Sequence, residues 1–422
     1  MSEVKNIPDG WEETTLKEYL DLLNGYAFKS DDFENEKIND SYLPILKIKN
    51  IANGNANHND VVFHKVNDNL EKYIIKEGDI LIALTGNHPS AITQVVGGIS
   101  RYYLKDKALL NQRVGKIYSK NENILNNDFI YYFFKWNNTQ FHIANQSSGS
   151  ASQANISKND VISTPINLPP KPEQKSIASI LTAFDDKIEL LQAQNKTLEA
   201  TAQTIFAEWF GKYKIEDKLP IGWSIKELDD LLELIIDYRG KTPLKLGLNW
   251  SENGIPAISA KSIKNGKIVR RDAMNFGSEE LYSIWMKDEL KKGDILLTSE
   301  APLGEMYYIN DDTKYILSQR VFALRVNKKI TAEYLFHYLF STNGQTLLQA
   351  RASGSTVSGI RQSELRKIEI IVPEKNVLDN VSKIFKTAFD KIFTNEEQIQ
   401  TLTKTRDELL PKLMSGEVRV KM

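Results

Sequence analysis

The side chains that most often carry catalysis occur in this chain without the spacing that catalysis needs. Cysteine is absent, which excludes a thiol nucleophile, a disulfide and a Cys-ligated metal. The histidines form no His-Glu-x-x-His pair, so no zinc site is predicted. They are His58, His64, His88, His142 and His337.

The nucleotide-binding motifs are also incomplete. Gly240-Lys241-Thr242 matches the end of a phosphate-binding loop, but Ile235 stands where the first glycine of that loop belongs. Asn167-Leu168-Pro169-Pro170 departs from the amino-methyltransferase motif at Leu168, and Lys171 replaces its aromatic residue. No Gly-x-Gly-x-x-Gly follows a strand-like segment. We therefore expect no catalytic residues, no metal and no cofactor in this chain.

Composition predicts a folded protein of more than one domain. The chain has 422 residues, of which 41% are hydrophobic and 26% charged, and its formal net charge is −1. There is thus no overall basic excess of the kind that marks many nucleic-acid-binding proteins. No apolar run reaches the roughly 18 residues of a membrane span, and the start lacks a signal sequence. These features predict a cytoplasmic protein without a membrane partner.

The sequence contains an internal repeat. Ile7-Pro8-Asp9-Gly10-Trp11 returns as Leu219-Pro220-Ile221-Gly222-Trp223, and further short matches follow in the same order in both halves. Self-similarity of this kind indicates a duplicated architecture. The further matches are Gly78-Asp79-Ile80-Leu81 with Gly293-Asp294-Ile295-Leu296, Gln112-Arg113-Val114 with Gln319-Arg320-Val321, Gly149-Ser150 with Gly354-Ser355, and Thr182-Ala183-Phe184-Asp185 with Thr387-Ala388-Phe389-Asp390.

Each copy begins with a globule, over residues 1–170 and 212–373. Glycine turns lead into short buried strands after Gly78 and Gly293. Aromatic-rich helices are predicted at Asn127–Asn137 and Thr331–Phe340. Two tandem α+β domains are the expected fold.

Each copy ends in a long helix, over residues 171–211 and 374–422. Apolar or small residues recur with alternating steps of four and three, which is the spacing of a coiled coil. We expect Gly211 to end the first helix and Pro411 to kink or end the second near Leu410. The recurring positions are Ile177, Leu181, Phe184, Ile188, Leu191, Asn195, Leu198, Ala202, Ile205 and Trp209, and then Val381, Phe385, Ala388, Ile392, Asn395, Ile399, Leu402, Arg406, Leu409 and Leu413.

One asparagine in each helix predicts how the two helices pair. In an antiparallel pair in full register, Asn195 faces Asn395, and a buried Asn pair fixes the register of a coiled coil. The same register places Arg406 opposite Phe184, with its charged head reaching solvent. The alternative is that each helix packs only on its own globule.

Taken together, these motifs make the chain resemble the specificity (S) subunit of type I restriction–modification enzymes. The resemblance covers essentially the whole chain. It rests on the duplicated Pro-x-Gly-Trp opening, on Gly-Asp-Ile-Leu and the Gly-Ser loop in each globule, on Leu168-Pro169-Pro170-Lys171-Pro172-Glu173-Gln174, and on Leu409-Leu410-Pro411-Lys412-Leu413-Met414-Ser415-Gly416-Glu417. The second copy departs from it at Val372-Pro373-Glu374-Lys375.

The resemblance implies a function without catalysis. Two target-recognition domains each read one half of a bipartite sequence in double-stranded DNA, and the antiparallel helices hold them apart. The helices also dock two methyltransferase (M) subunits, which bind S-adenosylmethionine and methylate adenine N6. Restriction (R) subunits join this core to cleave DNA.

Polar loops around the repeated motifs are the expected DNA-binding segments. In the first globule the candidates are Lys47, Asn50, Thr85, Asn87, Arg101, Gln112, Arg113, Ser147 and Ser150. In the second they are Arg239, Lys241, Lys261, Lys264, Arg270, Arg271, Ser299, Gln319, Arg320, Arg351, Ser355 and Arg361.

These residues have other interpretations. The repeated Gln-Arg pairs are equally consistent with structural or phosphate contacts, because base-reading residues should differ between half-sites. The Gly-Ser loops are equally consistent with linkers. The second globule is richer in arginine, which favours more guanine contacts there. A bivalent protein-interaction scaffold without DNA binding is the competing function.

Overall fold

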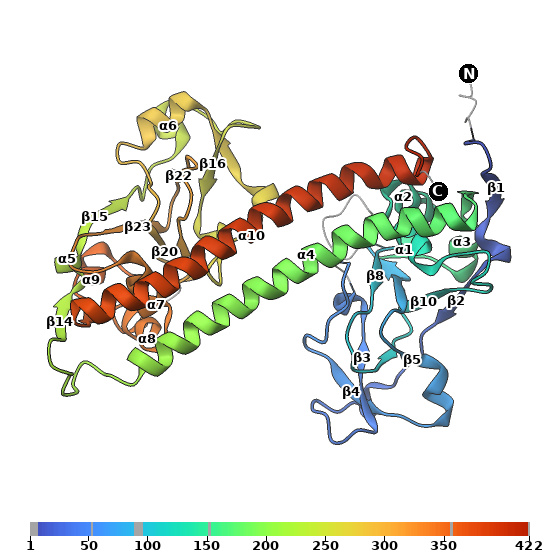
Figure 1. Ribbon diagram of the computed structural model, residues 1–422, viewed down its shortest axis with the longest axis horizontal. Coiled ribbons are helices and arrows are strands. Elements are labelled where there is room, and N and C mark those ends of the chain that lie inside the picture. Colours follow the sequence, from blue (N-terminus) through green and yellow to red (C-terminus); the bar gives the residue numbers. More distant parts are fainter. Residues whose placement is uncertain (1–6, 52–53, 88–95, 151–152, 355–357, 421–422) are drawn as a thin grey trace. The chain divides into compact units, whose positions relative to one another are not determined.

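The computed structural model describes residues 7–51, 54–87, 96–150, 153–354 and 358–420 (Figure 1). Contacts between Cα atoms divide the chain into two compact units. Unit 1 contains Met1–Glu189 and Gln400–Met422, and unit 2 contains Leu190–Ile399. The division falls within both long helices, so each unit holds one globule together with a part of each helix.

The central sheet of each unit has four antiparallel strands in matching order. In unit 1 the order is β2-β10-β6-β8, and in unit 2 it is β15-β23-β20-β21. The strands are β2 Leu20–Asn24, β6 Ile80–Ala83, β8 Ile99–Arg101, β10 Val114–Ser119, β15 Leu232–Asp237, β20 Ile295–Thr298, β21 Met306–Tyr308 and β23 Val321–Val326.

Smaller sheets complete each globule. In unit 1 they are β4-β3-β9-β5, β1-β13 and β11-β12-β7, and in unit 2 they are β19-β16-β22, β14-β24 and β17-β18. The strands of unit 1 are β1 Glu12–Thr15, β3 Tyr42–Leu46, β4 Val62–Lys65, β5 Ile74–Ile75, β7 Thr85–Gly86, β9 Ala108–Leu110, β11 Ser148–Ser150, β12 Gln153–Asn155 and β13 Pro165–Leu168. Those of unit 2 are β14 Ser224–Glu227, β16 Ile255–Ile258, β17 Ile263–Lys264, β18 Lys267–Ile268, β19 Asn275–Gly277, β22 Ile316–Leu317 and β24 Glu369–Val372.

The repeated Gly-Asp motif makes the turn that starts a central strand. Gly78 and Gly293 have φ values of +90° and +93°, a backbone conformation that glycine adopts without strain. The following aspartates accept backbone N–H bonds, from Lys76 at 2.9 Å and from Lys291 at 2.8 Å. The motif therefore recurs because the same turn recurs.

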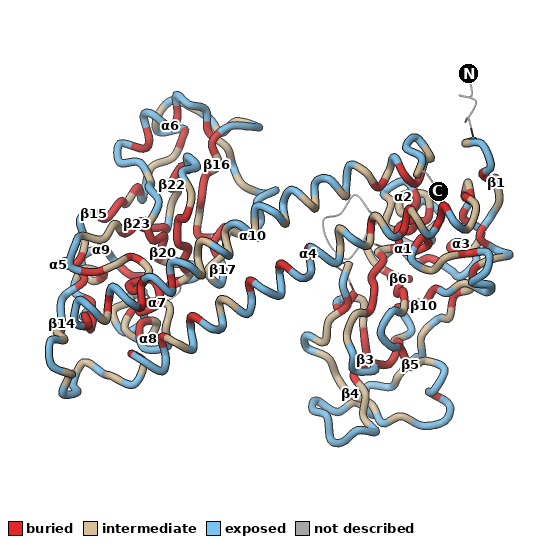
Figure 2. Tube along the Cα trace, viewed as in Figure 1, coloured by how far each residue is buried: buried red, intermediate tan, exposed pale blue. Residues whose placement is uncertain are grey.

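An aromatic helix is buried in each globule at the predicted place. These are α1 Asn127–Lys135 and α7 Ala332–Phe340. Figure 2 shows buried residues concentrated in the globules and on parts of the long helices. The remaining short helices are α2 Asn137–Asn145, α3 Lys158–Ile162, α5 Leu228–Leu231, α6 Glu279–Trp285, α8 Thr342–Ala350 and α9 Gln362–Leu365. The fold is α+β, as predicted.

The long helices are α4 Lys171–Phe206 and α10 Lys375–Ser415. A π-helical turn, Ala207–Gly211, extends α4. This wider turn breaks the heptad spacing, so Trp209 is 48% exposed and Phe210 takes the buried position. The expectation of an end near Leu410 is wrong, because α10 continues through Pro411 and buries Leu413.

In unit 2 the two helices meet through their asparagines. Asn395 donates from Nδ2 to Oδ1 of Asn195 at 2.8 Å, and both side chains are buried. This is the layer in which an antiparallel register places them. A buried amide needs such a partner, so a shift of register would leave both amides unpaired.

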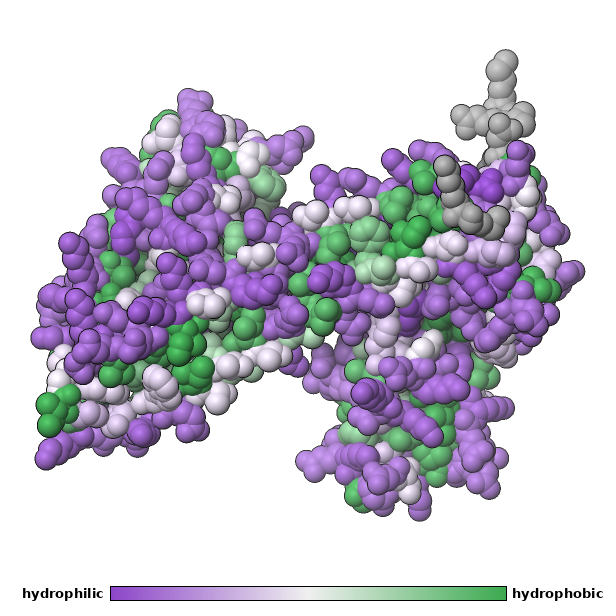
Figure 3. Space-filling model, in the orientation of Figure 1, coloured by the Kyte–Doolittle hydropathy of each residue, from purple (hydrophilic) through white to green (hydrophobic). Residues whose placement is uncertain are grey.

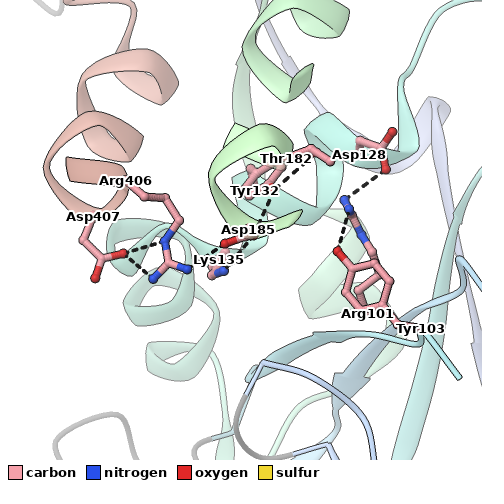
Figure 4. A network of polar contacts seen from close by, with 9 residues as sticks. All are labelled: Arg101, Tyr103, Asp128, Tyr132, Lys135, Thr182, Asp185, Arg406 and Asp407. Carbon is pink, nitrogen blue, oxygen red and sulfur yellow. Dashed lines mark hydrogen bonds and ion pairs between the residues drawn. The ribbon is translucent and has the colours of Figure 1, made fainter. Parts of the chain in front are cut away.

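In unit 1 a charged cluster joins α1, α4 and α10 (Figure 4). Asp185 of α4 accepts from Arg406 at 2.6 Å, from the Tyr132 hydroxyl at 2.9 Å and from Lys135 at 3.2 Å. The head of Arg406 therefore turns back to Asp185 and Asp407 instead of reaching solvent. Burial acts to raise the pKa of Asp185, but Lys135 and Arg406 hold it below its usual value.

The opening tryptophan of the first copy is tied to the start of α4. Trp11 donates from Nε1 to Glu173 at 3.0 Å, and Arg419 binds the same carboxylate at 2.7 Å. Gln174 donates to the carbonyl oxygens of Pro169 and Ile124. The Glu-Gln pair of the exit motif thus joins the segment just before β1, the first long helix and the C-terminal segment.

We predict that Asn195→Leu lowers the free energy of unfolding by about 2 kcal/mol, because it leaves the Asn395 amide buried without a partner. Replacing both asparagines by leucine should recover that loss, since a well-packed apolar layer needs no hydrogen bond. Urea unfolding of the three proteins measures the effect. A double variant as unstable as the single one would contradict this account.

We predict that Asp185→Asn costs about 3 kcal/mol of stability at pH 7, where the carboxylate is charged. Because the folded-state pKa is depressed, this stabilisation exists above the unfolded-state pKa of about 4 and is lost as pH falls through the folded value. The difference from the unmodified protein should therefore shrink near pH 3. Urea unfolding at both pH values measures it, with the exposed neighbour Asp186→Asn as control. An equal loss at both pH values would rule out the ionic contribution.

Candidate nucleic-acid interface

Four loops of unit 2 surround an open groove of about 580 Å³. They follow β15, β16 and β20 and precede β23. Four of the predicted DNA-binding residues line this groove, and they are Lys241, Lys261, Gln319 and Arg320. A second hollow of about 340 Å³ shares Lys261 with it and adds Arg270. The fold thus gathers five predicted residues, separated by up to 79 positions in sequence, on one surface that also contains apolar side chains such as Leu244 and Trp250.

Lys241 and Gln319 form the fixed wall of the groove. The Lys241 ammonium donates to the Trp285 carbonyl oxygen at 2.9 Å and lies 4.2 Å from the centre of the Tyr238 ring. Gln319 donates from Nε2 to the carbonyl oxygen of Lys241 at 2.9 Å. Burial, together with the charge of Lys287, lowers the pKa of Lys241. These contacts hold a cation in place before any ligand arrives.

The other cations of the groove are more exposed. Arg320 has a φ of +67° and pairs with Glu300 at 2.9 Å. Lys261 and Arg270 are exposed, and neither forms an ion pair within the described part of the chain. Unpaired exposed cations beside a polar hollow suit phosphate oxygens, since such contacts supply most of the affinity for DNA.

In unit 1 the small sheet β11-β12-β7 brings two predicted segments together. Thr85 of β7 is buried, and its hydroxyl donates to Asn155 Oδ1 of β12 at 2.7 Å. Ser147 and Asn87 flank this sheet and are half-buried. The Gly-Ser segment of the first copy is therefore a strand of a sheet rather than a free linker.

The corresponding Gln-Arg pair of unit 1 is accessible. Gln112 and Arg113 are both exposed, between β9 and β10. Lys47 lies at the end of β3, and its ammonium is 5.0 Å from the centre of the Phe33 ring. These three residues remain candidates for contact with DNA.

Four predicted residues are buried, and they are Asn50, Thr85, Arg101 and Ser299. Asn50 is 1% exposed, accepts from the backbone N–H of Lys47 at 3.0 Å and donates to the Asn59 carbonyl oxygen. Arg101 is 5% exposed and pairs with Asp128 at 2.9 Å beneath Tyr131. Ser299 is 2% exposed. A buried side chain cannot reach DNA, so these assignments are corrected.

The remaining candidates fall into two groups. Arg239 is held by Asp237 at 2.6 Å and Arg351 by Glu364 at 3.5 Å, so a phosphate would have to compete with a carboxylate. Exposed residues without an ion pair in the described chain are Lys264, Arg271 and Arg361. Ser355 and the side chain of Ser150 lie outside the described residues.

Sequence reasoning missed one further candidate residue. Lys49 in unit 1 stands where Lys261 stands in unit 2, three places after β3 and β16 respectively, and it is exposed. The signal was available, because Asn50 and Ser262, the next residues, both cap the turn through their side chains. Trp250, Asn249 and Asn275 also line the groove, and their approach depends on tertiary packing that no local pattern shows.

The part of the chain that the structure describes holds no cluster of three or more His, Asp or Glu side chains able to bind a metal. No helix among the described residues is long and apolar enough to cross a membrane.

Comparison with known proteins gives a consistent result across both copies. The profile of the family described as type I restriction modification DNA specificity domain matches twice, over residues 8–200 and 220–404. The MjaIX specificity subunit of Methanocaldococcus jannaschii is 23% identical, over 99% of this chain and 96% of its own length. The EcoBI specificity subunit of Escherichia coli is also 23% identical, over 98% and 87%.

A solved structure shares the fold. The crystal structure of the type I restriction–modification S subunit from M. genitalium superposes with a TM-score of 0.61 at 17% sequence identity, and it covers 100% of this chain and 99% of its own. The two profile matches follow the internal repeat and together cover most of the sequence. The chain therefore belongs to the type I restriction modification DNA specificity family and carries two copies of its domain.

Proposed function

We propose that this chain is the non-catalytic DNA-recognition subunit of a type I restriction–modification complex. Each globule would read one half of a bipartite target in double-stranded DNA. The observation that carries the proposal is the groove of unit 2, where Lys241, Lys261, Arg270 and Arg320 gather on one face. The Lys241 ammonium is held by hydrogen bonding, and Lys261 and Arg270 are exposed without an ion pair in the described chain. Cations of this kind can bind phosphates and so orient a protein on DNA.

The groove also contains groups that can read bases. Asn249 and Asn275 line it, and the side-chain amide of Asn can bond adenine in the major groove. Arg320 supplies the fork that suits guanine, provided that it exchanges Glu300 for a base. The first globule repeats Gln112 and Arg113 but has no counterpart of the Arg270-Arg271 pair among the arginines of its loops, which fits two unlike half-sites.

The long helices supply a surface for the proposed partners. Figure 3 shows apolar side chains reaching the surface along α4 and α10. Leu190 is 51% exposed and Ile384 43% exposed. We propose that two methyltransferase subunits dock on the helices and bring S-adenosylmethionine and the chemistry of adenine N6 methylation. Restriction subunits would join that assembly for cleavage. The helices would also set the spacing between the two half-sites.

The experiment is methylation mapping by long-read sequencing in cells that express this chain with its methyltransferase. We expect a split N6-methyladenine motif that is absent without the chain. Lys261→Gln combined with Arg270→Gln should weaken or relax one half of the motif and preserve the other, because both residues lie in one globule.

Lys328→Gln combined with Lys329→Gln is the control, because it removes the same number of positive charges, two, from exposed positions. Lys328 is exposed and follows β23, whereas Arg320 precedes it, so the two residues mark opposite ends of one strand. The control should leave the motif unchanged. A motif that forms without the chain would contradict the proposal. The absence of any motif when the proteins co-purify would favour a protein scaffold instead.

A further inference from the structure

Equivalent positions of the two units around the long helices carry different residues. Each long helix begins three residues after a strand of its globule, so positions can be matched by counting from Lys171 and Lys375. By this count Asp185 corresponds to Phe389, one place before Asp390, with which the short sequence repeat aligns it. By the same count Arg406 of α10 corresponds to Ala202 of α4.

The globules match in the same way. Tyr132 and His337 hold the same place in α1 and α7, as do Lys135 and Phe340. Arg101 lies opposite Ile80 in the sheet of unit 1, and Tyr308 lies opposite Ile295 in the sheet of unit 2. Because Ile80 and Ile295 are equivalent in the repeat, Arg101 and Tyr308 are equivalent too. The charged cluster of unit 1 is therefore replaced, residue by residue, by aromatic side chains, a histidine and an alanine in unit 2.

The replacement leaves a cavity of about 70 Å³ in unit 2. All five counterparts line it, and they are Ala202, Tyr308, His337, Phe340 and Phe389. Further aromatic rings, such as those of Phe336 and Phe385, complete the wall. The methyl side chain of Ala202 leaves this space open, whereas in unit 1 the Arg406 guanidinium binds Asp185 at the corresponding place.

Two buried polar atoms at this cavity have no hydrogen-bond partner among the described residues. They are Nε2 of His337 and Oδ1 of Asn310, whose residues are 7% and 6% exposed. An unpaired buried polar atom costs free energy, so it indicates a missing partner. Burial lowers the pKa of His337 to about 3, which keeps the imidazole neutral. With its proton on Nδ1, the ring offers Nε2 as an acceptor, as Asn310 offers its oxygen.

Carboxylates also face the cavity. Glu199 and Glu396 line it, and Glu199 pairs with Lys267 at 2.7 Å, which leaves Glu396 as the carboxylate without an ion pair among the described residues. Lys267 also lines the cavity, and burial raises the pKa of Glu396, so Glu396 is the single carboxyl there that a ligand's charge could offset. Aromatic faces and two free acceptors, together with this carboxyl, favour a ligand that is cationic and donates hydrogen bonds. An anionic ligand would not satisfy these groups, whereas a neutral donor such as water could bond the two acceptors without offsetting a carboxylate.

We propose that this cavity of unit 2 receives an arginine side chain presented by a second protein. The guanidinium would occupy the place that Arg406 occupies in unit 1, donate to Asn310 Oδ1 and His337 Nε2, and lie against the phenylalanine rings. The inference adds a docking contact to the proposed function and does not depend on DNA binding. Arginine fits this cavity because its guanidinium group is planar, positively charged and rich in hydrogen-bond donors, and it stacks on aromatic rings.

The test uses the isolated full-length chain and no DNA. Its five histidines allow the side-chain ¹⁵N signal of His337 to be followed by NMR and assigned with His337→Phe. Nα-acetyl-arginine amide at millimolar concentration should shift this signal saturably. Nα-acetyl-citrulline amide, which has the same shape without the charge, should shift it at least tenfold less at equal concentration.

Two variants at Ala202 distinguish the effect of filling the cavity from the effect of placing a positive charge in it. Ala202→Arg should supply the guanidinium from within the chain, raise the melting temperature above that of Ala202→Met, and abolish the response to the arginine amide. Ala202→Met should abolish the response without the added stability. Both variants retain the fold if their far-ultraviolet circular dichroism matches that of the unmodified protein.

Three outcomes would overturn the proposal. The first is an equal shift with the arginine and citrulline amides. The second is no shift with either amide, as expected of a cavity that holds only water. The third is a response to the arginine amide that survives in Ala202→Met. None of these depends on methylation, so failure here is distinguishable from failure of the proposed function.

Discussion

The structure depends first on the antiparallel register of α4 and α10. A heptad seam alone permits slippage, because apolar layers are nearly interchangeable. The bond between Asn195 and Asn395 removes this freedom in unit 2, and the bond between Arg406 and Asp185 removes it in unit 1. Each globule then packs on helix faces whose residues are fixed in place.

The duplication explains why one backbone supports different surfaces. The turns at Gly78 and Gly293 and the caps formed by Asn50 and Ser262 recur because the backbone requires them. Other equivalent positions have diverged freely, as in the exchange of the Asp185 cluster for aromatic side chains. Residues that recur in both copies therefore include those that stabilise the shared fold, whereas residues that differ give each copy its own surface and packing. Gln319, which holds the Lys241 loop, illustrates the first class.

Local patterns were sufficient to predict much of this fold. The α+β class, the aromatic helices, the glycine turns and the two long helices all follow from spacing along the chain. Burial was harder to predict. Arg101 looked like a surface residue because its partner Asp128 lies on another element, and Trp209 left the seam because a π turn shifts the period. The groove of unit 2 combines four loops that only the folded chain brings together, so its composition could be predicted only in part.

The central claim is that each copy reads its own half of the target. The most direct measurement is methylation mapping with a chain in which residues 8–168 and 220–372 have been exchanged, expressed with the same methyltransferase. The account predicts a motif whose two halves have changed places while the spacing between them is retained. An unchanged motif, formed by an exchanged chain that folds and co-purifies with the methyltransferase, would contradict it.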